Sequence, residues 1–281
     1  MASISNKVAT RLVAGIKRFQ SVLIAAKNRD VNESDTVIIV TDMLSDVFGY
    51  DKYSDITSEH AIKGTYCDLA IRCEEKLRFL IEVKAIGLEL KDAYVKQAID
   101  YGANQGIEWV VLTNAIHWRI YRIVFAQPID QELVAEIDFS TLLYKSDEHL
   151  ELLYLLTKEG ICKCWLDDYH AQKQAINRFS LAATILSEPL LDAMRRELRR
   201  LSPGIKISVE EIESALRKEV LKGEVVEGPK ADEARKRITK MQNKLLRKTT
   251  KTEEESTPPA TVLPISSSDA APQQQPPIAQ S

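Results

Sequence analysis

The feature that most constrains this chain is a pair of β-rich runs, residues 65–72 and 76–84, joined by a short polar turn. Side chains on a strand alternate between its two faces, so Glu82 and Lys84 project from the same face of the second run. A carboxylate and an ammonium on an otherwise apolar strand are costly to bury unless they are paired, solvated or bound to a metal. The two runs therefore predict a hairpin with a polar, chemically active end.

Length and composition set broad limits. A chain of 281 residues can form one substantial domain with a smaller appendage, or two modest domains. The net charge of -3 gives no whole-molecule argument for nucleic-acid binding, so any basic surface must be local. The first 30 residues do not have a signal-peptide pattern, and no apolar run approaches the roughly 18 residues of a membrane helix. We expect a cytoplasmic protein that makes no membrane contact.

The same expectation bears on the cysteines. Without a secretory signal, the four cysteines are expected to be reduced thiols rather than a disulfide framework. The Cys162-Lys163-Cys164 run with His170 nearby is too short a pattern to predict a zinc site. The four cysteines are Cys67, Cys73, Cys162 and Cys164.

Apolar periodicity in the first half of the chain alternates between helical and strand character. Asn32 is placed to cap the second helix, and Gly49 and Gly106 are placed to end helices. The order predicts an α/β fold, a mixed sheet flanked by helices, in a domain of residues 1–145. The expected helices cover about 4–28, 32–49 and 88–105, and the expected strands 65–72, 76–84, 108–113, 117–125 and, at an edge, 133–139.

The second half reads as a helical region, residues 146–248, followed by a tail, residues 249–281. Ser208 and Glu211 form a capping-box pattern for one of its helices. The tail is rich in Pro, Ser and Gln and is expected to be disordered. The helices are expected at about 148–158, 167–201, 208–222 and 231–248, the last of them strongly basic.

The polar end of the hairpin has the groups that phosphodiester hydrolysis needs. Asp68 and Glu82 on neighbouring strands could converge on one Mg²⁺ or Mn²⁺ ion, with the Val83 carbonyl as a further ligand. Such an ion activates water and neutralises charge on the phosphate, and Lys84 could orient that water. These residue types predict a metal-dependent phosphodiesterase.

Asp68 followed by Glu82-Val83-Lys84 resembles the signature of the PD-(D/E)xK nuclease superfamily. Together with further motifs in order, it resembles the N-terminal nuclease domain of type I restriction enzyme R subunits over about residues 30–125. The resemblance implies a restriction endonuclease-like fold and an Mg²⁺-dependent endonuclease acting on DNA. It also implies that Glu33 is an early acidic site residue, and that Gln97 and Tyr101 are an accessory pair. The further motifs are Asn32-Glu33-Ser34-Asp35-Thr36, Gln97-Ala98-Ile99-Asp100-Tyr101, and Val111-Leu112-Thr113-Asn114 followed by Trp118.

Two departures narrow this resemblance. Cys67 precedes Asp68 where the superfamily signature has proline. The chain also has no Gly-x-x-x-x-Gly-Lys-Ser/Thr loop, so ATP-driven translocation does not carry over. The resemblance implies a nuclease module without a motor.

Each residue also has a structural interpretation. Glu82 and Lys84 could be a solvated strand face, and Asp68 an exposed strand-end residue or a helix-cap partner. Gln97 and Tyr101 could be packing contacts, and Glu33 a charge at a helix N-terminus. The ordered set favours the nuclease. Two other hypotheses stay open. One is a catalytically silent nucleic-acid-binding or adaptor module that uses the basic helices. The other is a subunit of a restriction or defence system that cuts only with a protein partner. The oligomeric state is a separate question, and a homodimer is possible.

Overall fold

The computed structural model describes residues 4–62 and 65–255. The described chain divides after Ala175 into two compact units, which are considered separately. The part of the predicted disordered tail from residue 256 onward lies outside the described residues. The described helices contain no apolar stretch of the length that a bilayer-spanning segment requires.

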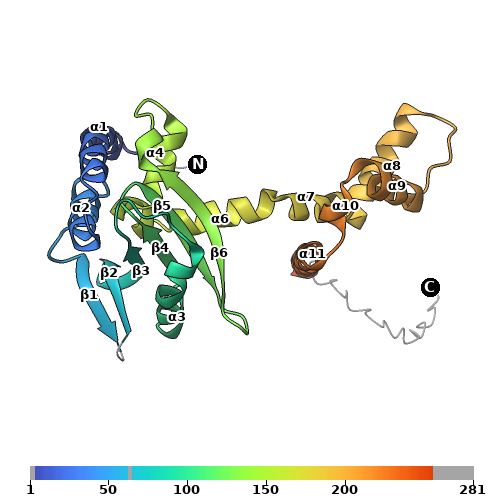
Figure 1. Ribbon diagram of the computed structural model, residues 1–281. Helices are drawn as coiled ribbons and strands as arrows, with labels where there is room; N and C mark the ends of the chain where they lie inside the picture. The colour runs from blue at the N-terminus through green and yellow to red at the C-terminus, as the bar shows by residue number, and fades with distance from the viewer. Residues whose placement is uncertain (1–3, 63–64, 256–281) are drawn as a thin grey trace, which may run out of the picture. The chain divides into compact units, whose positions relative to one another are not determined.

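The first unit is built around one six-stranded sheet with strand order β1-β2-β3-β4-β5-β6 (Figure 1). Strands β3 and β4 pair in parallel, and every other neighbouring pair is antiparallel. This confirms the predicted α/β fold with a mixed sheet; β1 had not been predicted. The strands are β1 (Ile56–Ile62), β2 (Thr65–Cys73), β3 (Lys76–Val83), β4 (Trp109–Thr113), β5 (His117–Val124) and β6 (Asp130–Asp138).

Helices cover both faces of this sheet (Figure 1). The larger apolar core includes α1, α2, α4 and α5 on one face, and the smaller core includes α3 on the other. The predicted helix at 88–105 is too long: a 3₁₀ turn, η1 (Asp92–Val95), precedes α3 (Lys96–Asn104). The remaining elements are α1 (Asn6–Asn28), α2 (Glu33–Asp46), η2 (Phe139–Thr141), α4 (Asp147–Tyr154), α5 (Lys158–Cys162) and α6 (Trp165–Ile176).

Local sequence explains how helix α2 begins and how β2 turns into β3. The Asn32 side chain accepts a hydrogen bond from the Asp35 amide, 2.8 Å away, and so caps α2. Glu74 and Glu75 both have positive φ, +54° and +63°, which is the backbone of a tight two-residue hairpin turn. That turn starts the β2–β3 pairing, and a β-bulge between Ile71 and Arg72 then shifts the register by one residue, so that Leu69 pairs with Ile81.

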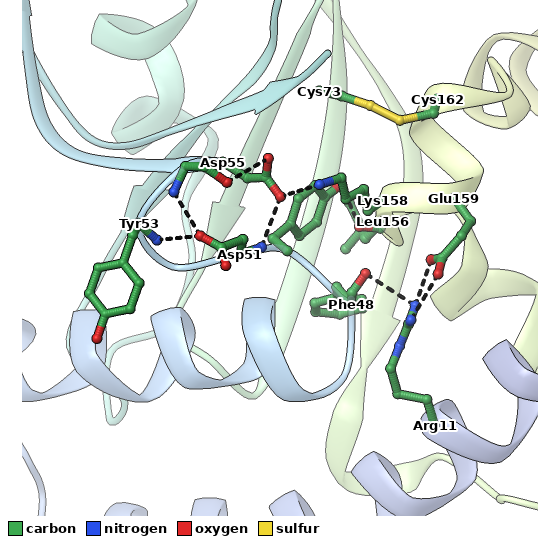
Figure 2. A network of polar contacts seen from close by, with 12 residues as sticks. Arg11, Phe48, Asp51, Tyr53, Asp55, Cys73, Leu156, Lys158, Glu159 and Cys162 are labelled. Carbon is green, nitrogen blue, oxygen red and sulfur yellow. Dashed lines mark hydrogen bonds and ion pairs between the residues drawn. A yellow bond between two sulfur atoms is a disulfide. The ribbon is translucent and has the colours of Figure 1, made fainter. Parts of the chain in front are cut away.

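Helix α5 is fastened to the sheet and to α1 by side-chain contacts (Figure 2). Arg11 on α1 binds Glu159 at 2.6 Å, and Lys158 binds the buried Asp55 at 2.5 Å. Cys73 at the end of β2 forms a disulfide bond with Cys162, with 6.3 Å between their Cα atoms. The expectation that all cysteines are reduced is therefore wrong for this pair, because the fold brings together two residues far apart in sequence.

The second unit is helical and has a small apolar cluster around Ala182, Val225 and Val226. The single helix predicted at 167–201 is instead three helices. The Asn177 side chain caps α7 by accepting from the Ser180 amide, and Pro189 in the first turn of α8 cannot continue a preceding helix. The Ser208–Glu211 capping box is confirmed. The elements are α7 (Arg178–Ile185), α8 (Glu188–Leu201), α9 (Val209–Ala215), a π-helical turn η3 (Leu216–Val220), α10 (Gly223–Val226) and α11 (Pro229–Glu255).

The basic helix α11 continues beyond Lys248, the residue at which the sequence pattern predicts the end of the helix and the start of a disordered tail. Residues 249–255 contain no proline or glycine, and the first proline after Lys248 is Pro258. The helix therefore has no breaking residue at the predicted boundary.

Candidate active site

The end of the β2–β3 ladder brings two carboxylates opposite each other. Leu69 pairs with Ile81, and one further step in this register sets Asp68 opposite Glu82. Residues directly opposite on antiparallel strands have Cβ atoms about 4.5–5.5 Å apart. Asp68 Oδ2 also accepts a hydrogen bond from the Val83 amide at 2.7 Å. The Asp68 carboxylate is thus held against the backbone of β3.

Glu82 and Lys84 form a largely buried ion pair on one face of the sheet. Lys84 Nζ lies 2.8 Å from Glu82 Oε1, and the two side chains are 15% and 13% exposed. Burial raises the pKa of Glu82 and the Asp68 charge raises it further, which the hydrogen bond from Lys84 only partly offsets. Burial lowers the pKa of Lys84, but the Glu82 hydrogen bond and the Glu82, Glu33 and Asp68 charges raise it above its ordinary value. Lys84 is therefore held as an ammonium ion among carboxylates.

Glu33 joins this group from a distant part of the sequence. It is the first residue of α2, and its Oε1 lies 3.4 Å from Lys84 Nζ. Its side chain is half-exposed, in contrast with those of Glu82 and Lys84. Lys84 consequently bridges two carboxylates, and the Asp68 charge acts on both members of the buried pair.

The predicted accessory pair lies on α3, which covers the same face. Tyr101 is 5% exposed and belongs to the apolar cluster that also contains Cys67 and Leu80. Burial raises the pKa of Tyr101 above its ordinary value, as does the nearby Cys67. Gln97 is exposed, one turn nearer the start of the helix. Both residues are therefore on the helix that covers the sheet face on which Asp68 and Glu82 lie.

Cys67 is a buried neutral thiol, not a nucleophile. Its Sγ donates to the Ile81 carbonyl at 3.1 Å and is 3.4 Å from the Leu69 carbonyl oxygen. Burial, together with the Glu82 and Asp68 charges, raises the pKa of Cys67 to about 12. A thiol at that pKa is protonated near neutral pH and is inert as a nucleophile. Its position beside Asp68 therefore serves packing.

The donor set fits a hard divalent cation of the Mg²⁺ type. Carboxylate oxygens are the ligands that such ions prefer, and Mg²⁺ keeps several waters, so a few protein oxygens suffice. Three carboxylates around one ammonium leave net negative charge in a partly buried place, which a cation would offset. Among residues 4–62 and 65–255, no group of three or more His, Cys, Asp or Glu is arranged to hold a metal. The candidate ligands, Asp68 and Glu82 with the Val83 carbonyl, form a smaller set.

Sequence reasoning gave no role to two residues that support this group. Thr36 on α2 and Asn114 after β4 both hydrogen-bond to the backbone of Ile86, two residues after Lys84. Asn114 lies in a motif that the resemblance includes. Thr36 also lies in such a motif, Asn32-Glu33-Ser34-Asp35-Thr36, three positions after Glu33.

Comparison with known proteins gives a family match over the same region of the chain. The model of the family described as Type I restriction enzyme R protein N terminus (HSDR_N) matches residues 39–137. The match is less than half of the chain and is consistent with a restriction endonuclease-like domain. It includes Asp68, Glu82 and Lys84 and the α3 pair, and it begins after Glu33. No curated protein and no solved structure gives a match.

Proposed function

We propose that the first unit is a metal-dependent endonuclease module that hydrolyses phosphodiester bonds of DNA with Mg²⁺ or Mn²⁺ and has no ATPase motor. The observation that carries the proposal is the position of Lys84 between Glu82 and Glu33, with Asp68 opposite Glu82. Asp68, Glu82 and Lys84 lie within the region that matches the restriction enzyme family, and Glu33 precedes that region. Packing of an apolar strand does not need these charged side chains, whereas metal-dependent hydrolysis of a charged diester uses carboxylates to hold the ion and a cationic group to bind the phosphate or the water.

Each residue has a distinct role in this proposal. Asp68, Glu82 and the Val83 carbonyl would hold the ion, which polarises the phosphate and lowers the pKa of bound water. Lys84 donates hydrogen bonds to the attacking water or to a phosphate oxygen. Glu33 holds the Lys84 ammonium toward the solvent side. Gln97 and Tyr101 orient the site or the DNA strand from α3.

The test is cleavage of plasmid and linear DNA with Mg²⁺, with Mn²⁺ and with EDTA. Asp68→Asn, Glu82→Gln and Lys84→Ala should each abolish cleavage, because each removes a group that acts on the reacting phosphate. Lys76→Ala is the matched control, since Lys76 is an exposed lysine at the other end of the same strand. Metal-dependent nicking that survives both Asp68→Asn and Lys84→Ala would reject the assignment and identify a contaminant.

A second candidate function is nucleic-acid binding by the helical second unit, with or without cleavage by the first. Basic side chains gather on two of its helices and could neutralise phosphates with strongly salt-dependent affinity. This module would bind DNA equally well with Lys84→Ala and lose affinity on truncation near residue 229. The basic residues are Arg195, Arg196, Arg199 and Arg200 on α8, and Lys230, Arg235, Lys236, Arg237, Lys240 and Lys244 on α11.

A third outcome concerns partners. If the purified chain binds Mn²⁺ and DNA without cleavage, the proposed role becomes that of a restriction or defence subunit that needs a protein partner. Reconstitution with that partner should then restore cutting that depends on Lys84. Sedimentation of the chain with and without DNA measures whether it acts as a homodimer.

A further inference from the structure

The backbone that follows Lys84 is anchored to the helix that carries Glu33 by the buried hydroxyl of Thr36. Thr36 Oγ1 donates to the Asn32 carbonyl at 2.8 Å and accepts from the Ile86 amide at 3.1 Å. Thr36 has no exposed surface, and Ile86 is 1% exposed. A hydroxyl has one donor and two acceptor positions, so it can make both bonds at once.

The two bonds connect the sequence neighbours of two candidate site residues. Asn32 directly precedes Glu33, and Ile86 comes two residues after Lys84. Lys84 Nζ and Glu33 Oε1 lie 3.4 Å apart although 51 positions separate the two residues in the sequence. The Thr36 hydroxyl therefore fixes the start of α2 against the chain that leaves β3.

Ile86 is also held from its other side. Asn114 Nδ2 donates to the Ile86 carbonyl at 3.4 Å and to the Leu88 carbonyl at 2.9 Å. Asn114 Oδ1 accepts from the His117 amide at 2.7 Å, which fixes the amide orientation. Both backbone groups of Ile86 are thus held by side chains from different elements.

We propose that Thr36 is a positioning residue of the candidate active site: through its bonds to Asn32 and Ile86 it sets Glu33 against Lys84, and Asn114 supports the same segment. This inference rests on the proposed nuclease function and assigns to it a residue that touches neither the substrate nor the ion. A site residue displaced by a fraction of an ångström loses much of its effect, so supporting hydrogen bonds are part of the site's performance. Thr36 acts through Glu33 and Lys84.

The decisive variants change the hydroxyl and little else. Thr36→Val keeps the shape, removes the oxygen and leaves the Ile86 amide without this acceptor. Thr36→Ser keeps the hydroxyl. Thr41→Val is the matched control, because Thr41 is on the same helix and donates in the same way to the carbonyl four residues earlier, Val37, at 2.8 Å.

Two measurements on the full chain test the proposal. Amide hydrogen exchange at Ile86 should accelerate in Thr36→Val and stay at the wild-type rate in Thr36→Ser and Thr41→Val. Mg²⁺-dependent DNA cleavage should fall about tenfold in Thr36→Val, the loss typical of a supporting hydrogen bond, and recover in Thr36→Ser. In a Glu33→Gln background Thr36→Val should add little, because both changes act on one contact.

The possible failures are distinguishable. Absence of cleavage by the wild-type chain rejects the proposed function before any variant is compared. If Thr36→Val exchanges the Ile86 amide faster but cleaves DNA at the wild-type rate, the bond is purely structural and the positioning role is overturned. Unchanged Ile86 exchange in Thr36→Val also overturns the positioning role. If Thr36→Val does not fold, Asn114→Asp gives a second route, since it keeps the Oδ acceptor and removes the donor to Ile86. Wild-type cleavage by a folded Asn114→Asp chain would count equally against the proposal.

Discussion

Breaking the Cys73–Cys162 disulfide should destabilise the protein by several kilocalories per mole. The two cysteines are separated by 89 positions in the sequence. In the chain-entropy model, release of a closed loop of this size restores to the unfolded chain entropy equivalent to about 4.6 kcal/mol at 25 °C. The Arg11–Glu159 and Asp55–Lys158 contacts hold the same helix, α5, in the folded state. The native structure should therefore persist, and the loss should come mainly from the unfolded state.

The assay is equilibrium urea unfolding followed by far-ultraviolet circular dichroism, with and without dithiothreitol. Reduction, or the double change Cys73→Ser and Cys162→Ser, should lower the free energy of unfolding by up to about 4.6 kcal/mol. The dependence on urea should steepen, because the reduced unfolded chain exposes more surface. Cys164→Ser is the control, since Cys164 is an exposed free thiol.

Two results would refute this reasoning. A change below about 1 kcal/mol on reduction would mean that the closed loop does not restrict the unfolded chain as the entropy model requires. An equal loss in Cys164→Ser would mean that a different pair of cysteines carries the stabilisation. The double variant must also lose its response to dithiothreitol, because no bond is left to reduce.

Three further changes test other parts of the first unit, each by urea unfolding. Burial and the Asp68 charge raise the pKa of Glu82 above the ordinary 4.5, so the free energy of unfolding should fall as pH rises from 4.5 through the folded-state pKa. Glu82→Gln should remove this pH dependence. An unchanged pH dependence in the variant would contradict its assignment to Glu82. Burial raises the pKa of Glu159 but the hydrogen bond from Arg11 lowers it below 4.5, so Glu159→Gln should cost about 1 kcal/mol at neutral pH. That cost should vanish as pH falls through the folded pKa, and a cost that persists there would point to packing instead. Trp118 is 1% exposed and stacks edge-on against Phe48, so Trp118→Ala should cost about 3–5 kcal/mol; a loss below 1 kcal/mol would mean that the core closes around the cavity.

Features with local determinants could be predicted from the sequence. The cap at Asn32 depends on a residue three positions away, and the Ser208 box on Glu211, so the chain itself shows both. The alternating pattern of β3 likewise identifies which face carries Glu82 and Lys84. The candidate site was predictable to the extent that its residues belong to such patterns.

Features fixed by distant contacts could not be predicted. The helix expected from Leu88 begins only at Lys96, because the Leu88 and Leu90 carbonyls accept hydrogen bonds from Asn114 and Arg119 instead of from a following helical turn. The Thr36–Ile86 bond joins positions 50 apart and has no sequence signature. The breaks before α7 and α8 are different, since the sequence contains a local signal for each: the capping residue Asn177 and the helix-breaking Pro189.

The single parallel pair in the sheet, β3 with β4, has a consequence for how this site could change. Parallel neighbours require a crossover, and here residues 84–108 leave the end of β3, pass through α3 and return to start β4. Asp68 and Glu82 lie on the antiparallel hairpin outside this crossover, whereas Gln97 and Tyr101 lie within it. Because the crossover also contains Lys84 and Ile86, only its helix α3 could be exchanged without loss of the site. Replacing α3 would alter the accessory residues and leave both carboxylates, Lys84 and the segment at Ile86 in place. Substrate preference could diversify in this fold while the proposed hydrolytic chemistry stays constant.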